Sequence, residues 1–192
     1  MTRPEQRNDV VDADAAAVAA AAAGDAAAFD ALVVRYQRRV LNTCWRYVGD
    51  AEAAADAAQN VFVKAWLGLG KFRGRATFSS WLYRIAVNEC LNMKAKRARR
   101  RAEPLDELTP DPAADPEQQR VEADVSRLVR AALDALPPKQ RVALILSKYE
   151  GLSYREIAAA LETSVPAVES LLFRAKQNLA AALAPARARG DL

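Results

Sequence analysis

Apolar side chains recur at intervals of three and four residues along most of this chain, and that spacing constrains its fold more than any other feature. From Phe29 to Val48 the apolar stripe runs for about five turns of helix. Gly24-Asp25 precedes this stripe and Gly49-Asp50 follows it, and both pairs favour helix ends. No stretch alternates with the two-residue period of a strand. The sequence therefore predicts an all-α protein.

The same spacing predicts the remaining helices and some of their ends. Ser153 and Glu156 form a capping box at the start of one short helix, and Ser164 is a predicted N-cap of the next. Gly151 is the predicted C-cap of the helix before them. Phe62, Trp66 and Trp81 are expected to point inward. The further helices are expected over residues 51–67, about 77–101, 125–136, 139–149, 153–161 and 165–183.

An acidic segment with four prolines, residues 102–121, interrupts the helical pattern. Few apolar residues and repeated helix-breaking prolines are typical of a flexible linker. The sequence therefore predicts two small helical domains, residues 25–101 and 122–184. The linker's carboxylates are hypothesised to lie over basic surface in the free protein.

Outside the two domains, the sequence predicts an alanine-rich arm over residues 1–24 and a tail over 185–192. The arm resembles a signal peptide, but Asp9, Asp12 and Asp14 stand where basic residues would be needed. We expect a frayed helix or a mobile arm. No apolar run approaches the roughly 18 residues of a membrane span, so a soluble, cytoplasmic protein without membrane insertion is expected.

Charge is strongly segregated along the chain. Residues 71–101 contain 10 basic side chains and the single acidic Glu89, a net charge of +9, whereas residues 102–126 have a net charge of −7. A basic block of this density indicates a polyanionic partner. The alternative is a charged face that only water contacts.

The composition excludes several classes of protein. Histidine is absent, which removes His-dependent triads and zinc fingers, and no acidic cluster or phosphate-binding loop supplies another catalytic site. We expect no enzyme, no metal and no cofactor. Cys44 and Cys90 are isolated in sequence and lie on or beside apolar stripes, so buried, inert thiols are favoured over redox sensors.

The short helix at 153–161 and the long one at 165–183 are separated by Glu162-Thr163-Ser164, the arrangement of a helix-turn-helix. In that motif the second helix enters the major groove of DNA. A helical hairpin that binds no DNA is the alternative.

Three segments, in order, resemble functional parts of bacterial sigma factors. DAAQNVFVKAW is similar to the helix that binds core RNA polymerase, KFRGRATFSSWLYRIAVNECLNMKAKRARR to the part that melts promoters and reads the minus-ten element, and LPPKQRVALILSKYEGLSYREIAAALETSVPAVESLLFRAKQNL to the domain that reads the minus-thirty-five element. With two domains and a linker, the chain resembles an extracytoplasmic-function (ECF) sigma factor. The resemblance implies three partners: core polymerase through the coiled coil of its largest subunit and its flap, promoter DNA, and an anti-sigma factor.

The resemblance also implies a surface that captures flipped bases of the melted non-template strand. Basic, aromatic and small polar side chains suit that task, and Arg84, Asn88 and Asn92 lie along one helix face because they are four residues apart. The basic side chains from Lys94 to Arg101 are expected to contact phosphates. The minus-ten set is Lys71, Phe72, Arg73, Arg75, Thr77, Phe78, Arg84, Asn88, Asn92, Lys96 and Arg97. For Phe78 and Asn88 the alternatives are a core ring and an ordinary surface amide.

The implied polymerase-binding set is Asp56, Gln59, Asn60, Val63 and Lys64. Relatives usually carry an acidic residue at the positions of Ala55 and Asn60, so a weaker or retuned affinity for core polymerase is expected. A plain solvated helix face is the alternative.

The implied minus-thirty-five set is Ser153, Tyr154, Arg155, Ser164, Val165, Pro166, Glu169, Ser170, Phe173, Arg174 and Lys176. Glu169 and Leu171 stand where many relatives carry arginine. Glutamate accepts a hydrogen bond from cytosine but repels phosphate, so an unusual minus-thirty-five preference is expected. Glu162 replaces a frequent turn glycine, and positive φ there would cost about 1 kcal/mol.

A promoter-specificity subunit is thus the leading interpretation. The alternatives are a sigma mimic that sequesters an anti-sigma factor, and a free helix-turn-helix regulator. The basic aromatic loop disfavours the first, and the polymerase-binding helix disfavours the second.

Overall fold

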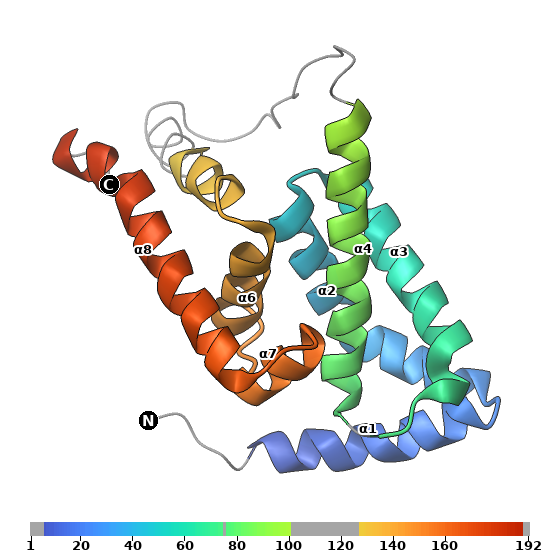
Figure 1. Ribbon diagram of the computed structural model, residues 1–192. Helices are drawn as coiled ribbons and strands as arrows, with labels where there is room; N and C mark the ends of the chain where they lie inside the picture. Colours follow the sequence, from blue (N-terminus) through green and yellow to red (C-terminus); the bar gives the residue numbers. More distant parts are fainter. Residues whose placement is uncertain (1–5, 75, 101–126, 190–192) are drawn as a thin grey trace, which may run out of the picture.

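The computed structural model describes residues 6–74, 76–100 and 127–189, with side chains for 14–74, 76–93 and 127–189. Every regular element in these ranges is helical (Figure 1), which confirms the all-α prediction. The elements are α1 (Gln6–Ala22), α2 (Ala26–Val48), α3 (Ala51–Gly68), the short 3₁₀ helix η1 (Leu69–Lys71), α4 (Phe78–Arg100), a helix over residues 127–134, α6 (Pro138–Lys148), α7 (Tyr154–Ala160) and α8 (Val165–Arg189). None of the described helices is long and apolar enough to cross a bilayer.

Local capping chemistry sets the ends of α2 and begins α3. The Asp25 carboxylate accepts hydrogen bonds from the amides of Ala27 and Ala28 at 2.9 and 3.2 Å. Gly49 ends α2 in the left-handed conformation, at φ 81°, which favours glycine because it has no β-carbon. Asp50 then caps α3 through the amide of Ala53. These caps confirm the predicted boundaries.

The N-terminal segment differs from the frayed helix or mobile arm that the sequence predicts. It forms α1, which packs against α2, α4 and η1. Val18 and Ala21 are buried, and the Asp14 carboxylate, itself 5% exposed, binds the Arg35 guanidinium and the Tyr36 hydroxyl of α2. Alanine side chains bury little apolar area, so the composition of this segment did not predict that it would pack on the core. The hydrogen bonds of Asp14 with α2 supply the additional contact.

Helix α4 forms the centre of the N-terminal core. Leu82, Tyr83 and Ala86 are completely covered. Trp81 is half-buried against Phe72 and Phe78. Trp66, by contrast, is 40% exposed and its ring lies 5.0 Å from that of Phe29, so the inward orientation predicted for it is wrong.

The C-terminal part contains the predicted helix-turn-helix, α7 and α8. Ser153 and Glu156 form the predicted capping box, and the Ser164 hydroxyl accepts from the amide of Ala167. Helix α6 ends at Lys148 with Tyr149 as its C-cap, so Gly151, at φ 64°, lies in the following loop and is not that cap.

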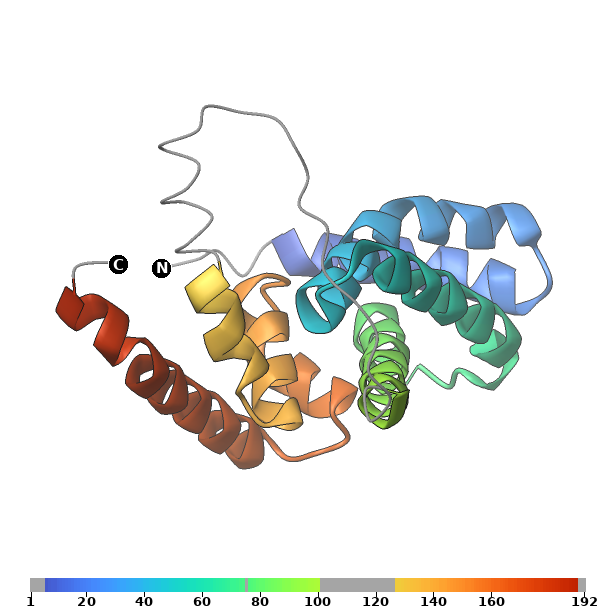
Figure 2. The same ribbon diagram turned by 90° about the horizontal axis from the view of Figure 1, so that it is seen from above.

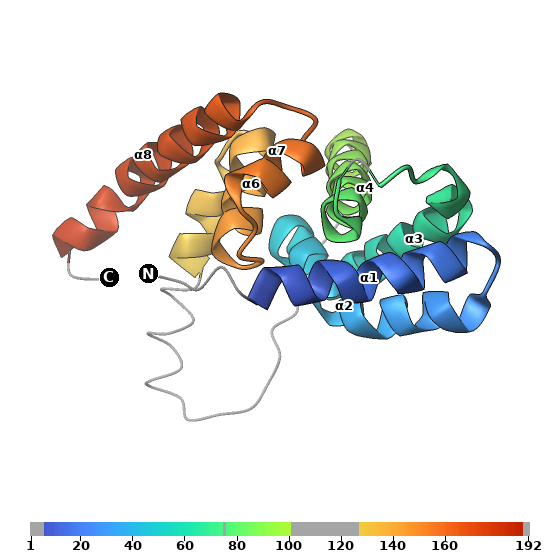
Figure 3. The same cartoon turned by 90° about the horizontal axis from the view of Figure 1, so that it is seen from below.

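The N-terminal and C-terminal helices lie against each other. α7 packs on α4, and α6 packs on α2. In all three views α4 lies between α3 on one side and α6, α7 and α8 on the other (Figure 1, Figure 2 and Figure 3). The predicted linker, residues 102–121, falls outside the described residues, and the domain boundaries stay predictions.

Removing the Asp14 carboxylate tests whether α1 is part of the fold. We expect Asp14→Ala to lower the free energy of unfolding by about 1–3 kcal/mol, because the buried Tyr36 hydroxyl loses its acceptor. Urea denaturation measures the change. Asp30→Ala, at an exposed acid on α2, is the control and should stay within about 0.5 kcal/mol of the parent. Equal effects of the two substitutions would contradict the packing of α1.

Candidate functional site

The loop between η1 and α4 rests on a cluster of aromatic rings. Phe78 is 4% exposed, and its ring lies 5.6 Å from Tyr36, 5.8 Å from Trp81 and 6.3 Å from Phe72. Thr77 caps α4 by accepting a hydrogen bond from the amide of Ser80 at 3.2 Å. In this conformation Phe78 is a core ring that supports the loop and offers no face to a base. Phe72 is half-buried and keeps part of its ring accessible.

The charged and amide side chains of the predicted minus-ten set lie on the surface. Lys71 and Arg73 are exposed on the loop, and Asn88 and Asn92 are exposed on α4. Arg84, 37% exposed at its side chain, forms an ion pair with Glu162 at 2.9 Å. Arg75 and the side chains of Lys96 and Arg97 fall outside the described residues.

Helix α8 presents one face to its own core and another to solvent. Val168, Leu172 and Ala175 are buried against α6 and α7. The predicted minus-thirty-five residues on the other side are exposed, with Phe173 at 63%. They are Pro166, Glu169, Ser170, Phe173, Arg174 and Lys176. Tyr154 and Arg155 of α7 and Ser164 of the turn are also exposed, whereas Val165 and Ser153 are half-buried.

The turn of the helix-turn-helix contains the strained residue that the sequence predicts. Glu162 has φ 50°, which makes it the one non-glycine residue with positive φ among the described residues. A β-carbon in this conformation crowds the following carbonyl. The Glu162 side chain reaches Arg84 on α4, so the turn also connects the two helical halves.

An open apolar groove of about 570 Å³ runs between α2 and α3. Two of the five predicted polymerase-binding residues, Gln59 and Val63, line it. Asp56 and Asn60 are exposed on α3 outside that lining, and Lys64 is paired with Glu89 of α4.

The remaining groove residues are not in the predicted polymerase-binding set. They are Phe29, Val33, Gln37, Leu41, Ala55, Ala58, Phe62, Trp66 and Leu67. Leu67 is 75% exposed, Val63 51% and Leu41 40%. One sequence feature could have predicted this exposed groove: the apolar stripes of residues 29–48 and 61–67 are wider than the single buried face of a helix requires.

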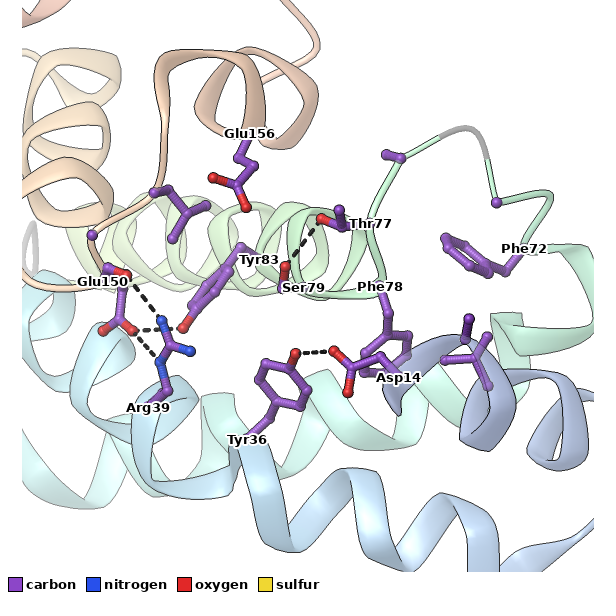
Figure 4. Close-up of a pocket in the computed structure, with 16 residues that line it drawn as sticks. Asp14, Tyr36, Arg39, Phe72, Thr77, Phe78, Ser79, Tyr83, Glu150 and Glu156 are labelled. Carbon is purple, nitrogen blue, oxygen red and sulfur yellow. Dashed lines mark hydrogen bonds and ion pairs between the residues drawn. The ribbon is translucent and has the colours of Figure 1, made fainter. Parts of the chain in front are cut away.

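A second cavity, of about 270 Å³, lies where the two helical halves meet (Figure 4). Glu150, in the connection between α6 and α7, has a side chain only 4% exposed. Its carboxylate accepts hydrogen bonds from Arg39 Nε at 3.0 Å, from the Thr43 hydroxyl at 2.8 Å and from the Tyr83 hydroxyl at 2.6 Å. Burial, reinforced by this carboxylate, raises the pKa of Tyr83 well above its usual value. The sequence analysis did not identify this cluster.

Both cysteines are buried, as the sequence predicts. The hydrogen bond with Cys44, followed by burial, raises the pKa of the Cys90 thiol far above its ordinary value. A thiol that stays protonated is a poor nucleophile. Among the described residues no three Cys, Asp or Glu side chains gather as metal ligands would.

Comparisons with known proteins all match sigma factors. Residues 32–100 match the family model of sigma-70 region 2, and residues 126–179 match that of sigma-70 region 4. The chain is 38% identical over 174 residues to the RNA polymerase sigma-H factor of Pseudomonas aeruginosa, covering 84% of this chain and 89% of that protein. It is 35% identical over 166 residues to the ECF RNA polymerase sigma-E factor of Escherichia coli, with coverages of 81% and 86%.

Solved structures show the same architecture. CnrH, in complex with the cytosolic domain of CnrY, superposes with a TM-score of 0.70 at 29% identity, over 90% of this chain and 98% of that one. The sigma factor RpoE of Bartonella quintana, in complex with the anti-sigma factor NepR, shares the fold with a TM-score of 0.63 at 23% identity, over 81% and 96%.

Two substitutions at the strained turn separate backbone strain from the loss of the ion pair. Glu162→Ala and Glu162→Gly both remove the carboxylate that binds Arg84, but only alanine keeps a β-carbon at positive φ. We expect the glycine variant to be more stable than the alanine variant by about 1 kcal/mol in urea unfolding. An alanine variant that is at least as stable would show that the turn stores no strain.

Proposed function

Because this chain belongs to the extracytoplasmic-function (ECF) sigma factors, which are not enzymes and direct transcription initiation, we propose that it divides that task among three surfaces. The groove between α2 and α3 docks on core RNA polymerase. The loop before α4, together with the face of α4 that contains Asn88 and Asn92, captures the melted minus-ten strand. The exposed face of α8 reads the minus-thirty-five duplex.

The open groove is the observation that carries the proposal. Apolar side chains such as Val63, Leu67 and Leu41 stand 40–75% exposed along it. A contiguous apolar surface of this kind marks a protein-binding site, and a hollow between two helices suits a helical partner. The coiled coil of the polymerase's largest subunit is the partner that the family implies. This assignment shifts the centre of the predicted contact from Asp56 and Asn60 toward the groove.

The minus-ten surface combines charge with a firm support. Lys71 and Arg73 are exposed on either side of Phe72 in the sequence, and the ring of Phe72 is partly accessible. The rings of Phe78 and Trp81 pack against the ring of Phe72. Cations that attract phosphate next to a stacking ring suit single-stranded DNA. Asn88 and Asn92 supply amides that can donate to and accept from base edges.

On α8, Pro166, Glu169, Ser170 and Phe173 lie on one exposed side of the first two turns, where a recognition helix meets base edges. Arg174 and Lys176 follow and suit phosphate. Glu169 is the residue that would favour cytosine at its contacted position.

Regulation and location are the finer parts of the proposal. The structures of CnrH and the Bartonella RpoE each contain a protein partner. We propose that this chain also binds an anti-sigma factor. A protein that acts on polymerase and promoter DNA works in the cytoplasm.

Transcription from fragmented genomic DNA tests the proposed function. Purified core polymerase with this chain should produce new RNA 5′ ends that share two upstream motifs. Val63→Glu should weaken core binding by about tenfold or more, because it places a charge in the apolar groove. Val34→Glu is the matched control, since Val34 is 69% exposed on α2 but does not line the groove. Equal core affinity of the two variants would contradict the groove assignment.

A substitution on the minus-ten surface should impair promoter discrimination without changing the affinity for core polymerase. Asn88→Ala removes one exposed amide of α4. Because one lost hydrogen bond corresponds to about tenfold in affinity, we expect about tenfold weaker discrimination between the mapped minus-ten motif and a scrambled one, with core affinity unchanged. Competition transcription on the two templates measures this discrimination, and fluorescence anisotropy measures core affinity. A loss of core affinity would show that α4 is part of the docking surface.

A further inference from the structure

The most basic part of the chain contains one acid, and that acid is buried. Residues 71–101 have 10 basic side chains and the single carboxylate of Glu89. Glu89 lies on α4 directly after Asn88, and its side chain is only 11% exposed. A carboxylate taken out of water costs free energy unless a charged or hydrogen-bonding partner compensates it. The partner of Glu89 therefore matters to the whole basic surface.

That partner comes from the neighbouring helix. Lys64 of α3 donates a hydrogen bond from Nζ to Oε2 of Glu89 and forms an ion pair with it. α3 packs along α4 (Figure 1), so the pair joins the two helices at their contact. The Lys64 side chain is 53% exposed, which places the pair at the edge of that contact, partly in water.

Lys64 is turned away from the apolar groove between α2 and α3. Val63 lines the groove but Lys64 does not, because consecutive residues of a helix point about 100° apart. Lys64 is one of the five residues that the family resemblance assigns to polymerase binding. In this structure its ammonium is directed to α4 instead.

The Glu89 carboxylate lies next to the amides that we propose for DNA. Asn88 precedes Glu89, and Asn92 is three residues further on, a spacing that makes two side chains neighbours on a helix. Both asparagines are exposed. A partly buried charge is screened less by salt than an exposed one. Without its lysine, Glu89 would therefore repel the phosphates of a strand that lies on this face.

We propose that Lys64 acts on the minus-ten strand through Glu89. Its ammonium neutralises the single acid of the basic block and holds the carboxylate toward α3, which keeps this face of α4 attractive to DNA. Lys64 is thus a positioning residue of the minus-ten surface and not a polymerase contact. The inference rests on the proposed function, because it requires α4 to meet the melted strand.

Substitutions of the two partners should change DNA affinity in opposite directions. The pair has a net charge of zero, Lys64→Met leaves −1, Glu89→Gln leaves +1, and the double variant returns to zero. If Lys64 contacted a phosphate directly, the double variant would also bind weakly. If the pair only stabilised the fold, both single variants would bind weakly.

Fluorescence anisotropy of a labelled single-stranded oligonucleotide measures these changes. The oligonucleotide contains the minus-ten motif mapped by transcription, and holoenzyme is assembled from each variant with saturating core polymerase. We expect Lys64→Met to bind about threefold to tenfold more weakly than the parent and Glu89→Gln to bind more tightly by a similar factor. The double variant should stay within about twofold of the parent. The differences should shrink as salt rises, and core affinity should not change.

Lys71→Met is the matched control for a cation that meets phosphate directly. Lys71 is exposed on the loop before α4. Its substitution should weaken strand binding by the same factor in the parent and in the Glu89→Gln background, because its effect does not pass through Glu89.

A Lys64→Met holoenzyme that binds the strand as tightly as the parent, or a double variant as weak as Lys64→Met, would overturn the inference. Weaker core binding by Lys64→Met would also overturn it and return Lys64 to the polymerase surface. If Lys64→Met does not fold, Glu89→Gln decides alone: tighter strand binding supports the inference, and unchanged or weaker binding overturns it.

Failure of the proposed function has a different signature. A parent holoenzyme that binds the mapped strand no better than a scrambled one would overturn the proposed minus-ten surface, and this role of Lys64 with it. A parent that prefers the mapped strand, with Lys64→Met indistinguishable from it, would overturn the role of Lys64 alone.

Discussion

The packing of α4 against two sets of neighbours is the constraint on which the rest of the structure depends. Leu82 and Ala86 are completely covered in the core that α4 shares with α2 and α3. Tyr83, also completely buried, donates its hydroxyl to Glu150 of the C-terminal half. The helix therefore holds the N-terminal fold together and, through its other side, receives α7. Asn88 and Asn92 lie on its remaining exposed strip, which is the part of α4 that we propose for nucleic acid.

The arginines show why net charge alone is a poor guide to function in this chain. Arg39, Arg46, Arg130 and Arg141 add to the positive charge of the chain, yet each makes a contact between the helical halves. A planar guanidinium can stack on a ring and donate hydrogen bonds at the same time, which suits it to such partly buried sites. The block at 71–101 is different, since Lys71 and Arg73 stand exposed.

Features that depend on neighbouring residues could be predicted from the sequence. The caps at Asp25, Asp50 and Ser153 follow from side chains within three or four residues of each other. The exposed face of α8 follows in the same way from helical spacing. The positive φ of Glu162 is suggested instead by the family resemblance, because relatives often carry glycine at that turn position.

Contacts between residues far apart in sequence could not be predicted. The Asp14 carboxylate accepts a hydrogen bond from Tyr36, 22 residues away in sequence, and that of Glu150 accepts one from Tyr83, 67 residues away. Nothing local to an acidic residue says that it will be buried. The groove was missed for a related reason: periodicity shows that Val63 and Trp66 lie on an apolar side of α3, but not that α2 leaves that side uncovered.

The groove between α2 and α3 is separate from the contact between the helical halves. α3, with half of the groove, lies on the other side of α4 from α6, α7 and α8 in every view (Figure 1). None of the residues that line the groove belongs to the hydrogen bonds that Arg39, Thr43 and Tyr83 make with Glu150. A ligand shifts a conformational equilibrium only by its differential affinity for the two states. A partner bound at the groove alone would therefore leave the contact between the halves as it is, because the groove does not depend on that contact.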